Sequence, residues 1–271
     1  MMGRRGLMYP YHLWMLLFTV VPLGLILYFA LTDKTGAFTL ANIRQAAQPV
    51  YLGVLWHSVW LALLATGVCL LLGYPMAYIL VSSPIKYRNM LVVLTVIPMW
   101  MNFLLRTYAW LTLLERNGLI NGVLRWLGLP ALQILYTDYA VILGMVYNFL
   151  PFMILPIYSV LMKMDKSLLE AAEDLGADSF TAFRRVTLPL SLPGVYAGVL
   201  MVFMPAVTTF VISRLLGGGQ YMLIGNLIEQ QFLSIGNWNF GSAVSVLMLI
   251  IILLTMLVPG KYREEEGGML I

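Results

Sequence analysis

The feature that most constrains this chain is a set of six apolar runs, each long enough to cross a lipid bilayer. A helix needs about 20 mainly apolar residues to cross the ~30 Å hydrocarbon layer, because lipid leaves every backbone amide to be paired within the segment. Five of the runs contain no Asp, Glu, Lys or Arg, and the third contains Arg106 alone. An all-α integral membrane protein with an unbroken helical bundle is predicted, with spans at 11–31, 56–81, 90–114, 139–162, 193–212 and 241–258.

The composition supports a membrane protein and gives it an orientation. Charged residues make up 10% of the chain, against about 25% in a soluble domain. Many of the Lys and Arg residues stand in short links beside the spans, where positive charge sets orientation rather than binding nucleic acid. Ten of them fall on the side of the two termini and six on the other. We therefore expect a multi-pass protein of the cytoplasmic (inner) membrane, with both termini in the cytoplasm.

The predicted spans divide the chain into three segments. Residues 1–55 hold a cytoplasmic start, the first span and an outer loop; residues 56–258 hold five spans and the cytoplasmic link 163–192; residues 259–271 form a cytoplasmic tail. Three residues of types that often bind metals are isolated from one another, because His12, His57 and Cys69 have no Cys, His or acid at ligand spacing. No metal site is expected.

The link between the fourth and fifth spans has the pattern of two short helices. Ser167 with Glu170 three residues later is a capping box, and Gly176 can supply the left-handed residue that ends the first helix. Asp178 or the serine after it can cap the second helix, which Pro189 is expected to stop. The sequence therefore predicts a rigid helical knob at the membrane surface.

The charge of this knob indicates what it contacts. Residues 168–178 carry four acids and no base. Leu168, Ala172 and Leu175 share one helix face, with most of the acids outside it. An amphipathic segment lying on anionic lipid would be expected to have a basic polar face. A protein partner fits the knob better than lipid does.

The same link resembles the signature of the inner-membrane permeases of binding-protein-dependent ABC importers. That signature is Glu-Ala-Ala, three residues, Gly, nine residues, a β-branched apolar residue, one residue, then Leu-Pro. The chain matches it at the family's spacing, with valine where isoleucine is usual, at Glu170, Ala171, Ala172, Gly176, Val186, Leu188 and Pro189.

The resemblance implies a fold and a set of partners. The fold is the type I importer permease architecture of six helices with a cytoplasmic coupling helix, which docks on a separate ATPase dimer. The chain is expected to be a transport subunit rather than an enzyme and to bind no cofactor, with ATP and Mg²⁺ held by the ATPase. A second homologous permease subunit and an extracytoplasmic binding protein complete the expected assembly.

From about residue 57 to 258 the chain is similar to the spermidine/putrescine permeases, in particular to the first permease subunit of such systems. The stretches that carry this likeness are 73–78, 97–102, 150–158 and 223–226. The likeness implies a polyamine as the transported solute. A permease of the same type for thiamine, iron or an oxyanion is the alternative within the class.

No predicted span contains a carboxylate, so the spans cannot pair a polyamine with a negative charge. They can offer it aromatic faces and neutral oxygens instead. A cation over an aromatic ring gains ~0.5–2 kcal/mol, which can guide passage without trapping the solute. The candidate path residues are Trp100, Asn102, Tyr108, Tyr147, Asn148, Thr208 and Thr209, and the candidate residues at the outer entrance are Glu115, Asp138 and Glu229.

Other aromatic and basic side chains near the span ends are interpreted as interfacial. Trp110, Tyr139 and Trp238 suit an aromatic belt. Arg106 and Arg214 stand toward the outer ends of their spans, where snorkelling to the interface is expected. Arg106 is also expected to pair with an acid, on this chain or on a partner subunit.

Two functions of other classes compete with transport by an ATP-driven importer. A membrane-embedded enzyme would be expected to carry His, Asp or Glu clusters at membrane depth, and the spans carry none. A passive channel would have no need of the coupling signature. The chain also has no Gly-rich phosphate loop followed by Lys-Ser or Lys-Thr, so ATP hydrolysis is expected on another chain.

Overall fold

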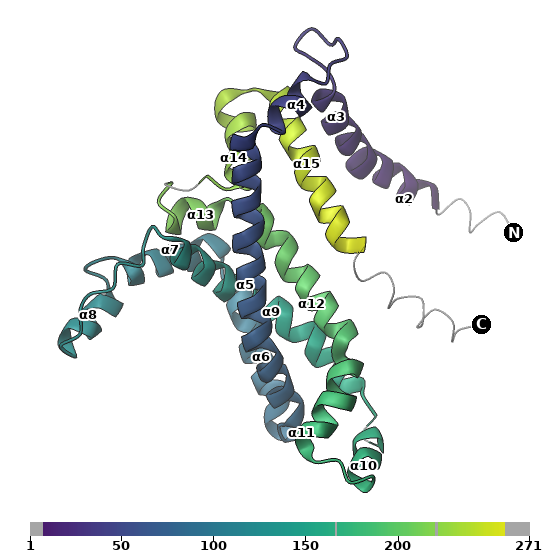
Figure 1. The fold of residues 1–271 in the computed structure, drawn as a ribbon, viewed down its shortest axis with the longest axis vertical. Coiled ribbons are helices and arrows are strands. Elements are labelled where there is room, and N and C mark those ends of the chain that lie inside the picture. Colours follow the sequence, from purple (N-terminus) through teal and green to yellow (C-terminus); the bar gives the residue numbers. More distant parts are fainter. Residues whose placement is uncertain (1–7, 166, 220–221, 258–271) are drawn as a thin grey trace, which may run out of the picture. The chain divides into compact units, whose positions relative to one another are not determined.

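A computed structural model describes residues 8–165, 167–219 and 222–257, and these are mostly helical (Figure 1). Within them, five helices are long and apolar enough to cross a membrane. A sixth crossing is present if the two helices Ile85–Trp100 and Phe103–Trp126, which meet at 90°, form one broken span. The all-α membrane fold is confirmed. The described residues fall into two compact units, which divide at 57/58, 222/223 and 254/255.

The first unit packs the two ends of the described chain around a small core. Asn239 ties them together, because its side-chain amide donates to the carbonyls of Phe29 at 3.1 Å and Thr32 at 2.7 Å. Phe240 lies at the centre of the core, with its ring 4.8 Å from that of Tyr51. The helices of this unit are α2 (Met8–Met15), α3 (Val21–Ala30), α4 (Ala41–Ala46), the start of α5 (Pro49–Ser82), α14 (Ile224–Glu229) and most of α15 (Trp238–Leu257), with π-helical turns η1 (Leu16–Val20) and η3 (Gln230–Ile235).

The second unit holds the longer helices of the bundle. Two short helices lie at one end of it, and three lie toward the opposite end (Figure 1). The long helices are the rest of α5, α6 (Ile85–Trp100), α9 (Asp138–Lys163) and α12 (Leu188–Thr208). The short ones are α10 (Ser167–Asp174) and α11 (Ser179–Ala182), which leads through η2 (Phe183–Thr187) into α12, and at the opposite end α7 (Phe103–Leu114), α8 (Leu119–Trp126) and α13 (Val211–Leu216).

Helices α9 and α12 approach closely because α12 presents glycines there. Gly194 and Gly198 stand four residues apart, a spacing that lets membrane helices meet backbone to backbone. A β-carbon on Gly194 would lie 2.9 Å from the carbonyl oxygen of Pro156 and 3.0 Å from the Cα of Ile157. A β-carbon on Gly198 would lie 2.8 Å from the sulfur of Met153, which is fully buried. This contact fixes the spacing of the two helices.

The third predicted span, 90–114, is not one helix. It breaks between Trp100 and Phe103, and the two parts meet at 90°. Asn102 begins the second helix, since its side-chain oxygen accepts the amide of Leu104 at 2.8 Å. The prediction of an unbroken span is therefore wrong, because an N-cap within an apolar run starts a new helix that the apolar count does not reveal.

The fifth predicted span, 193–212, has different ends in the structure. A helix runs without interruption from Ser179 to Thr208. Pro189 lies in the first turn of α12, directly after a π-helical turn, so it does not stop the helix as expected. The wider winding of the preceding π-helical turn accommodates this proline inside the continuous helix. The second span is also longer than predicted, at Pro49–Ser82.

Arg106 is buried inside the second unit. Its side chain is only 7% exposed, and its Nε and Nη1 atoms have no hydrogen-bond partner among the described residues. The expected snorkelling is therefore wrong for Arg106, because α7 turns away from the axis of α6 and packs the residue inside the second unit. Arg214, by contrast, is exposed. Pairing of Arg106 with an acid of a partner subunit stays a prediction.

The tight contact at Gly194 can be tested by adding volume. We expect Gly194→Val to lower the stability of the detergent-solubilised protein by ~1–3 kcal/mol, because the new side chain meets backbone atoms that cannot rotate away. Gly67→Val is the matched control: it is the same change in a long helix, but at a position where a β-carbon meets nothing within 4 Å. Thermal unfolding followed by circular dichroism measures both, and equal midpoints for the two variants would contradict the packing described.

Candidate functional site

The knob predicted from the sequence is present as α10, α11 and the turn between them, residues 167–182. Gly176 has a φ of +84°, as predicted. The amide of Ala177 donates to the carbonyl of Ala172 at 3.0 Å, which closes α10 with the hydrogen bond typical of a glycine-terminated helix. Gly176 therefore ends α10 at a defined position.

Two aspartates fix the starts of the knob's helices. Asp165, rather than the predicted Ser167, supplies a side-chain oxygen at the start of α10, since it accepts the amide of Ser167 at 3.0 Å. This hydrogen bond lowers the pKa of Asp165. Asp178 is the N-cap residue of α11, as predicted, and the hydroxyl of Thr181 donates to its carboxylate. That hydrogen bond lowers the pKa of Asp178, so both caps are ionised at neutral pH.

Three of the seven signature residues meet around one small pocket. Ala172, Gly176 and Val186 line a cavity of about 340 Å³ between α10 and the segment that follows α11. Leu188 is partly buried at the start of α12. Glu170, Ala171 and Pro189 are exposed. The signature thus contributes both to the interior of the knob and to its surface.

The surface of the knob combines exposed apolar side chains with acids. Leu175 is 90% exposed and Phe180 is 69% exposed. Three acids of α10, Glu170, Glu173 and Asp174, are also exposed. Large exposed apolar side chains rimmed by charge are typical of a protein interface.

The root of the knob is joined to the long helix α5 by aromatic contacts that the sequence analysis did not identify. The ring of Phe183 makes edge contacts with Tyr74 at 5.8 Å and Tyr78 at 5.9 Å. Ser191 donates its hydroxyl proton to the carbonyl of Leu188 at 2.9 Å, so Tyr74 is the donor in its 2.8 Å hydrogen bond with Ser191. The spacing of Tyr74 and Tyr78, four residues apart on one helix face, was the available signal.

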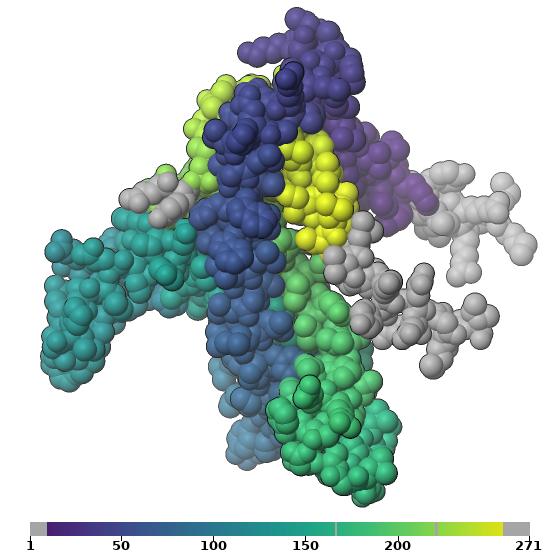
Figure 2. Space-filling model, in the orientation of Figure 1, coloured from purple at the N-terminus to yellow at the C-terminus, as the bar shows by residue number. Residues whose placement is uncertain are grey.

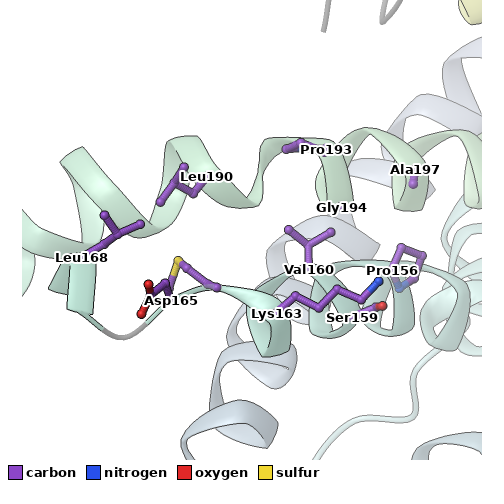
Figure 3. A pocket seen from close by; sticks show the side chains of 11 residues that line it. Pro156, Ser159, Val160, Lys163, Asp165, Leu168, Leu190, Pro193, Gly194 and Ala197 are labelled. Atoms are coloured by element: carbon purple, nitrogen blue, oxygen red, sulfur yellow. The ribbon is translucent and has the colours of Figure 1, made fainter. Parts of the chain in front are cut away.

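A groove of about 520 Å³ lies between α9 and α12 at the base of the knob (Figure 3). Leu168 of α10 and Leu190 of α12 both line it. Lys163, at the end of α9, extends along the groove toward Ser159 in Figure 3. The knob therefore stands on α9 and α12 with an open space at its base.

The candidate path residues all lie in the second unit but have different environments. Trp100 and Tyr108 are exposed, and Asn102 caps α7. Thr208 donates its hydroxyl proton to the carbonyl of Met204 at 3.1 Å, and Thr209 is buried where α12 ends.

Asn148 is the candidate with the most unusual setting. It is buried in α9 and its amide donates to the carbonyl of Gly144 at 2.9 Å. Its Oδ1 has no hydrogen-bond partner among the described residues. A buried carbonyl oxygen without a donor is costly, so Asn148 is distinguished by one unpaired acceptor inside the bundle, and its role in a path stays a prediction.

Tyr147 lies in an apolar groove of about 430 Å³ lined by residues of α5, α7 and α9. Its ring contacts that of Trp110 edge to face, with centroids 5.4 Å apart. Tyr139 lines the same groove and is largely exposed. The structure thus brings Tyr147, a candidate path residue, together with Trp110 and Tyr139, which the sequence places in an interfacial aromatic belt.

The candidate entrance residues are distributed over both units. Glu115 is exposed directly after α7, and Asp138 is partly buried in the first turn of α9. Glu229 ends α14 in the first unit. Among the residues that the structure describes, no group of three or more His, Cys, Asp or Glu side chains is arranged to hold a metal ion.

Comparison with known proteins agrees with this geometry. The family described as "Binding-protein-dependent transport system inner membrane component" matches residues 69–261. The spermidine/putrescine transport system permease protein PotB of Escherichia coli K12 is 43% identical over 253 residues, which cover 90% of this chain and 92% of that protein. The PotB protein of Haemophilus influenzae is 41% identical over 261 residues, 93% of this chain and 91% of that protein.

Other similar proteins include a further permease and a solved transporter. The inner membrane ABC transporter permease protein YdcU of Escherichia coli K12 is 33% identical over 81% of this chain and 74% of its own length. A chain in the crystal structure of a bacterial ABC transporter that imports the acidic polysaccharide alginate superposes with a TM-score of 0.76 at 18% identity, over 96% of this chain and 94% of that chain.

A chain in the crystal structure of a bacterial alginate ABC transporter in complex with an alginate pentasaccharide-bound periplasmic protein superposes with a TM-score of 0.75. At 18% identity these structures show the fold alone. The family match over most of the chain and the relatives above 40% identity settle its class. The chain belongs to the inner-membrane permeases of binding-protein-dependent ABC importers, and its role is that of a transport subunit rather than an enzyme.

Proposed function

We propose that this chain forms part of the translocation path for polyamines, spermidine or putrescine, across the cytoplasmic membrane. The observation that carries the proposal is the identity of 41–43%, over about nine-tenths of the chain, to permeases named for spermidine and putrescine transport. The path chemistry is compatible with a polycation. The predicted spans contain aromatic rings and neutral oxygens and no carboxylate, so a polyamine would be guided without being held.

The knob is the proposed docking element for a separate ATPase dimer, which would hold ATP and Mg²⁺. Its exposed Leu175 and Phe180, beside several acids, suit an apolar pocket with a basic rim. Movement of the knob would reach the spans by two routes. One is the continuous helix from Ser179 to Thr208, and the other is the contact of Phe183 with Tyr74 and Tyr78.

The proposed orientation places the knob and both termini in the cytoplasm. It rests on the excess of Lys and Arg on that side, ten against six. In this orientation α7, α8 and α13 lie toward the extracytoplasmic side, where Glu115 and Asp138 could attract a cation delivered by a polyamine-binding protein. A second homologous permease subunit would supply the rest of the path and an acid for Arg106, whose charge would otherwise repel the cargo.

The coupling proposal predicts the effect of two single substitutions. We expect Glu170→Lys to lower uptake by about thirtyfold or more, since reversing a central interface charge costs ~2 kcal/mol or more. Gly176→Pro is expected to abolish uptake, because proline cannot adopt the φ of +84° found there. Solute uptake into membrane vesicles and the amount of co-purifying ATPase measure both effects.

Gly176→Asn is the matched control, because asparagine tolerates the left-handed conformation and a β-carbon there meets nothing within 4 Å. It is expected to keep most of the uptake. All three variants should be present in the membrane at the level of the parent protein. Undiminished uptake in both Glu170→Lys and Gly176→Pro would remove the proposed coupling role.

The substrate proposal predicts that cells lacking this chain lose uptake of radiolabelled spermidine. Restoring the chain together with its ATPase and binding protein should restore that uptake, and unlabelled putrescine should compete. Thiamine, iron and an oxyanion such as sulfate serve as comparison solutes in the same cells. Equal spermidine uptake with and without the chain, in cells that have no other polyamine importer, would refute the assignment.

A further inference from the structure

The segment 115–132, which contains α8 and is called here the α8 arm, is a rigid element at the end of the second unit opposite the knob. Asn121 holds it together and is only 1% exposed. The side-chain amide of Asn121 donates to the carbonyls of Glu115 and Leu132, both at 3.0 Å. Its oxygen accepts the amide of Leu132 at 2.7 Å. One side chain therefore joins the beginning, the middle and the end of the arm.

A left-handed glycine and one backbone hydrogen bond fix the end of α8. Gly128 has a φ of +74°, and the amide of Leu129 donates to the carbonyl of Leu124 at 2.8 Å. This is the hydrogen bond that terminates a helix at a left-handed glycine. The arm is therefore a preformed surface rather than a loop that reshapes itself around whatever it meets.

The arm presents an apolar face that the described residues of this chain leave uncovered. Leu119, Val123, Trp126 and Leu127 recur at the spacing of one helix face. All four are exposed, Trp126 to 85%. Figure 2 shows the arm projecting away from the other helices of the second unit. Beyond α8, Leu129 and Leu132 extend the exposed apolar surface.

The charge of the arm favours lipid as the occupant of this face. The arm contains two arginines, Arg116 and Arg125, and a single acid, Glu115 at its first residue, whereas the knob contains four acids and no base. Arg125 turns away from the apolar face, since its Nε donates to the carbonyl of Asn121 at 3.3 Å and its Nη1 donates to the oxygen of Asn117 at 3.4 Å. An apolar face containing Trp and Leu, next to a basic polar edge, is the pattern of a helix that lies in a membrane interface.

The position of the arm in the chain keeps it near the bilayer. Four residues separate α7 from α8, and α9, which is one of the membrane-spanning helices, begins at Asp138. The hydrogen bonds of Asn121 to both ends of the arm restrict how far α8 can move from these helices. The exposed face therefore stays close to the ends of α7 and α9.

We propose that the α8 arm is an interfacial anchor that lies in the leaflet at the end of the bundle opposite the knob. Leu119, Val123 and Trp126 enter the boundary between headgroups and acyl chains. Arg116 and Arg125 lie at the level of the lipid phosphates. The anchor holds α7, and with it the broken third span, at a fixed depth. This inference depends on membrane insertion alone and not on the identity of the transported solute.

Spin labels test the anchor in the complete transporter reconstituted in nanodiscs of mixed zwitterionic and anionic phospholipid. Cys69 is replaced first (Cys69→Ala), and single cysteines are then introduced by Val123→Cys or Trp126→Cys. We expect labels at both sites to be relaxed more by oxygen than by a water-soluble nickel chelate, at a depth of about 5–10 Å below the phosphates. A label introduced by Asn117→Cys, on the exposed polar edge, is the matched control and should respond mainly to nickel.

Two results would overturn the proposal. Labels at 123 and 126 that respond mainly to nickel would place the face in water. Labels that are immobilised and shielded from both reagents would show that a protein covers it, either the second permease or, if shielding requires its addition, the binding protein. Each variant should first be shown to assemble with the ATPase like the parent, so that failure of the proposed function is recognised separately.

Discussion

The close approach of α9 and α12 is the interaction on which the rest of the second unit depends. In lipid there is little hydrophobic drive for helices to associate, so association rests on close packing and hydrogen bonds. Gly194 and Gly198 let the backbone of α12 meet α9 at Pro156 and Met153. These helices are also the two supports of the knob, since α9 ends just before it and α12 continues from it. A knob on rigidly paired supports transmits displacement, whereas one on a flexible loop would absorb it.

The π-helical turn η2 explains how Pro189 and a continuous helix coexist. A proline inside a helix normally removes one hydrogen bond and clashes with the carbonyl four residues earlier. Here the turn Phe183–Thr187 is wound more widely before Pro189. The same turn directs Phe183 toward Tyr74 and Tyr78 of α5. One local irregularity thus preserves the 30-residue helix and adds a third long helix to the contacts at the root of the knob.

The sequence predicts those features that depend on local chemistry, and it fails where three-dimensional packing decides. Apolar length identifies the crossing helices, and Gly176 identifies the end of α10, because each signal resides in consecutive residues. The break at Asn102 was missed because an N-cap inside an apolar run leaves hydropathy unchanged. Arg106 is buried in the helix that this N-cap begins, which hydropathy does not indicate either. The spacing of Tyr74 and Tyr78 places both rings on one helix face but does not identify Phe183, more than 100 positions away, as their partner.

The two ends of the second unit illustrate how charge assigns a partner to an exposed apolar surface. Apolar exposure by itself does not distinguish protein from lipid, because both bury such surface. At the knob, Leu175 and Phe180 stand among acids, which anionic headgroups repel, so a basic protein surface is the favoured neighbour. On the α8 arm, Trp126 directly follows Arg125, and the two arginines of the arm outnumber its one acid, Glu115, a balance that favours anionic headgroups. The sign of the neighbouring charge therefore favours a protein at the knob and lipid at the α8 arm, although the two surfaces have similar apolar character.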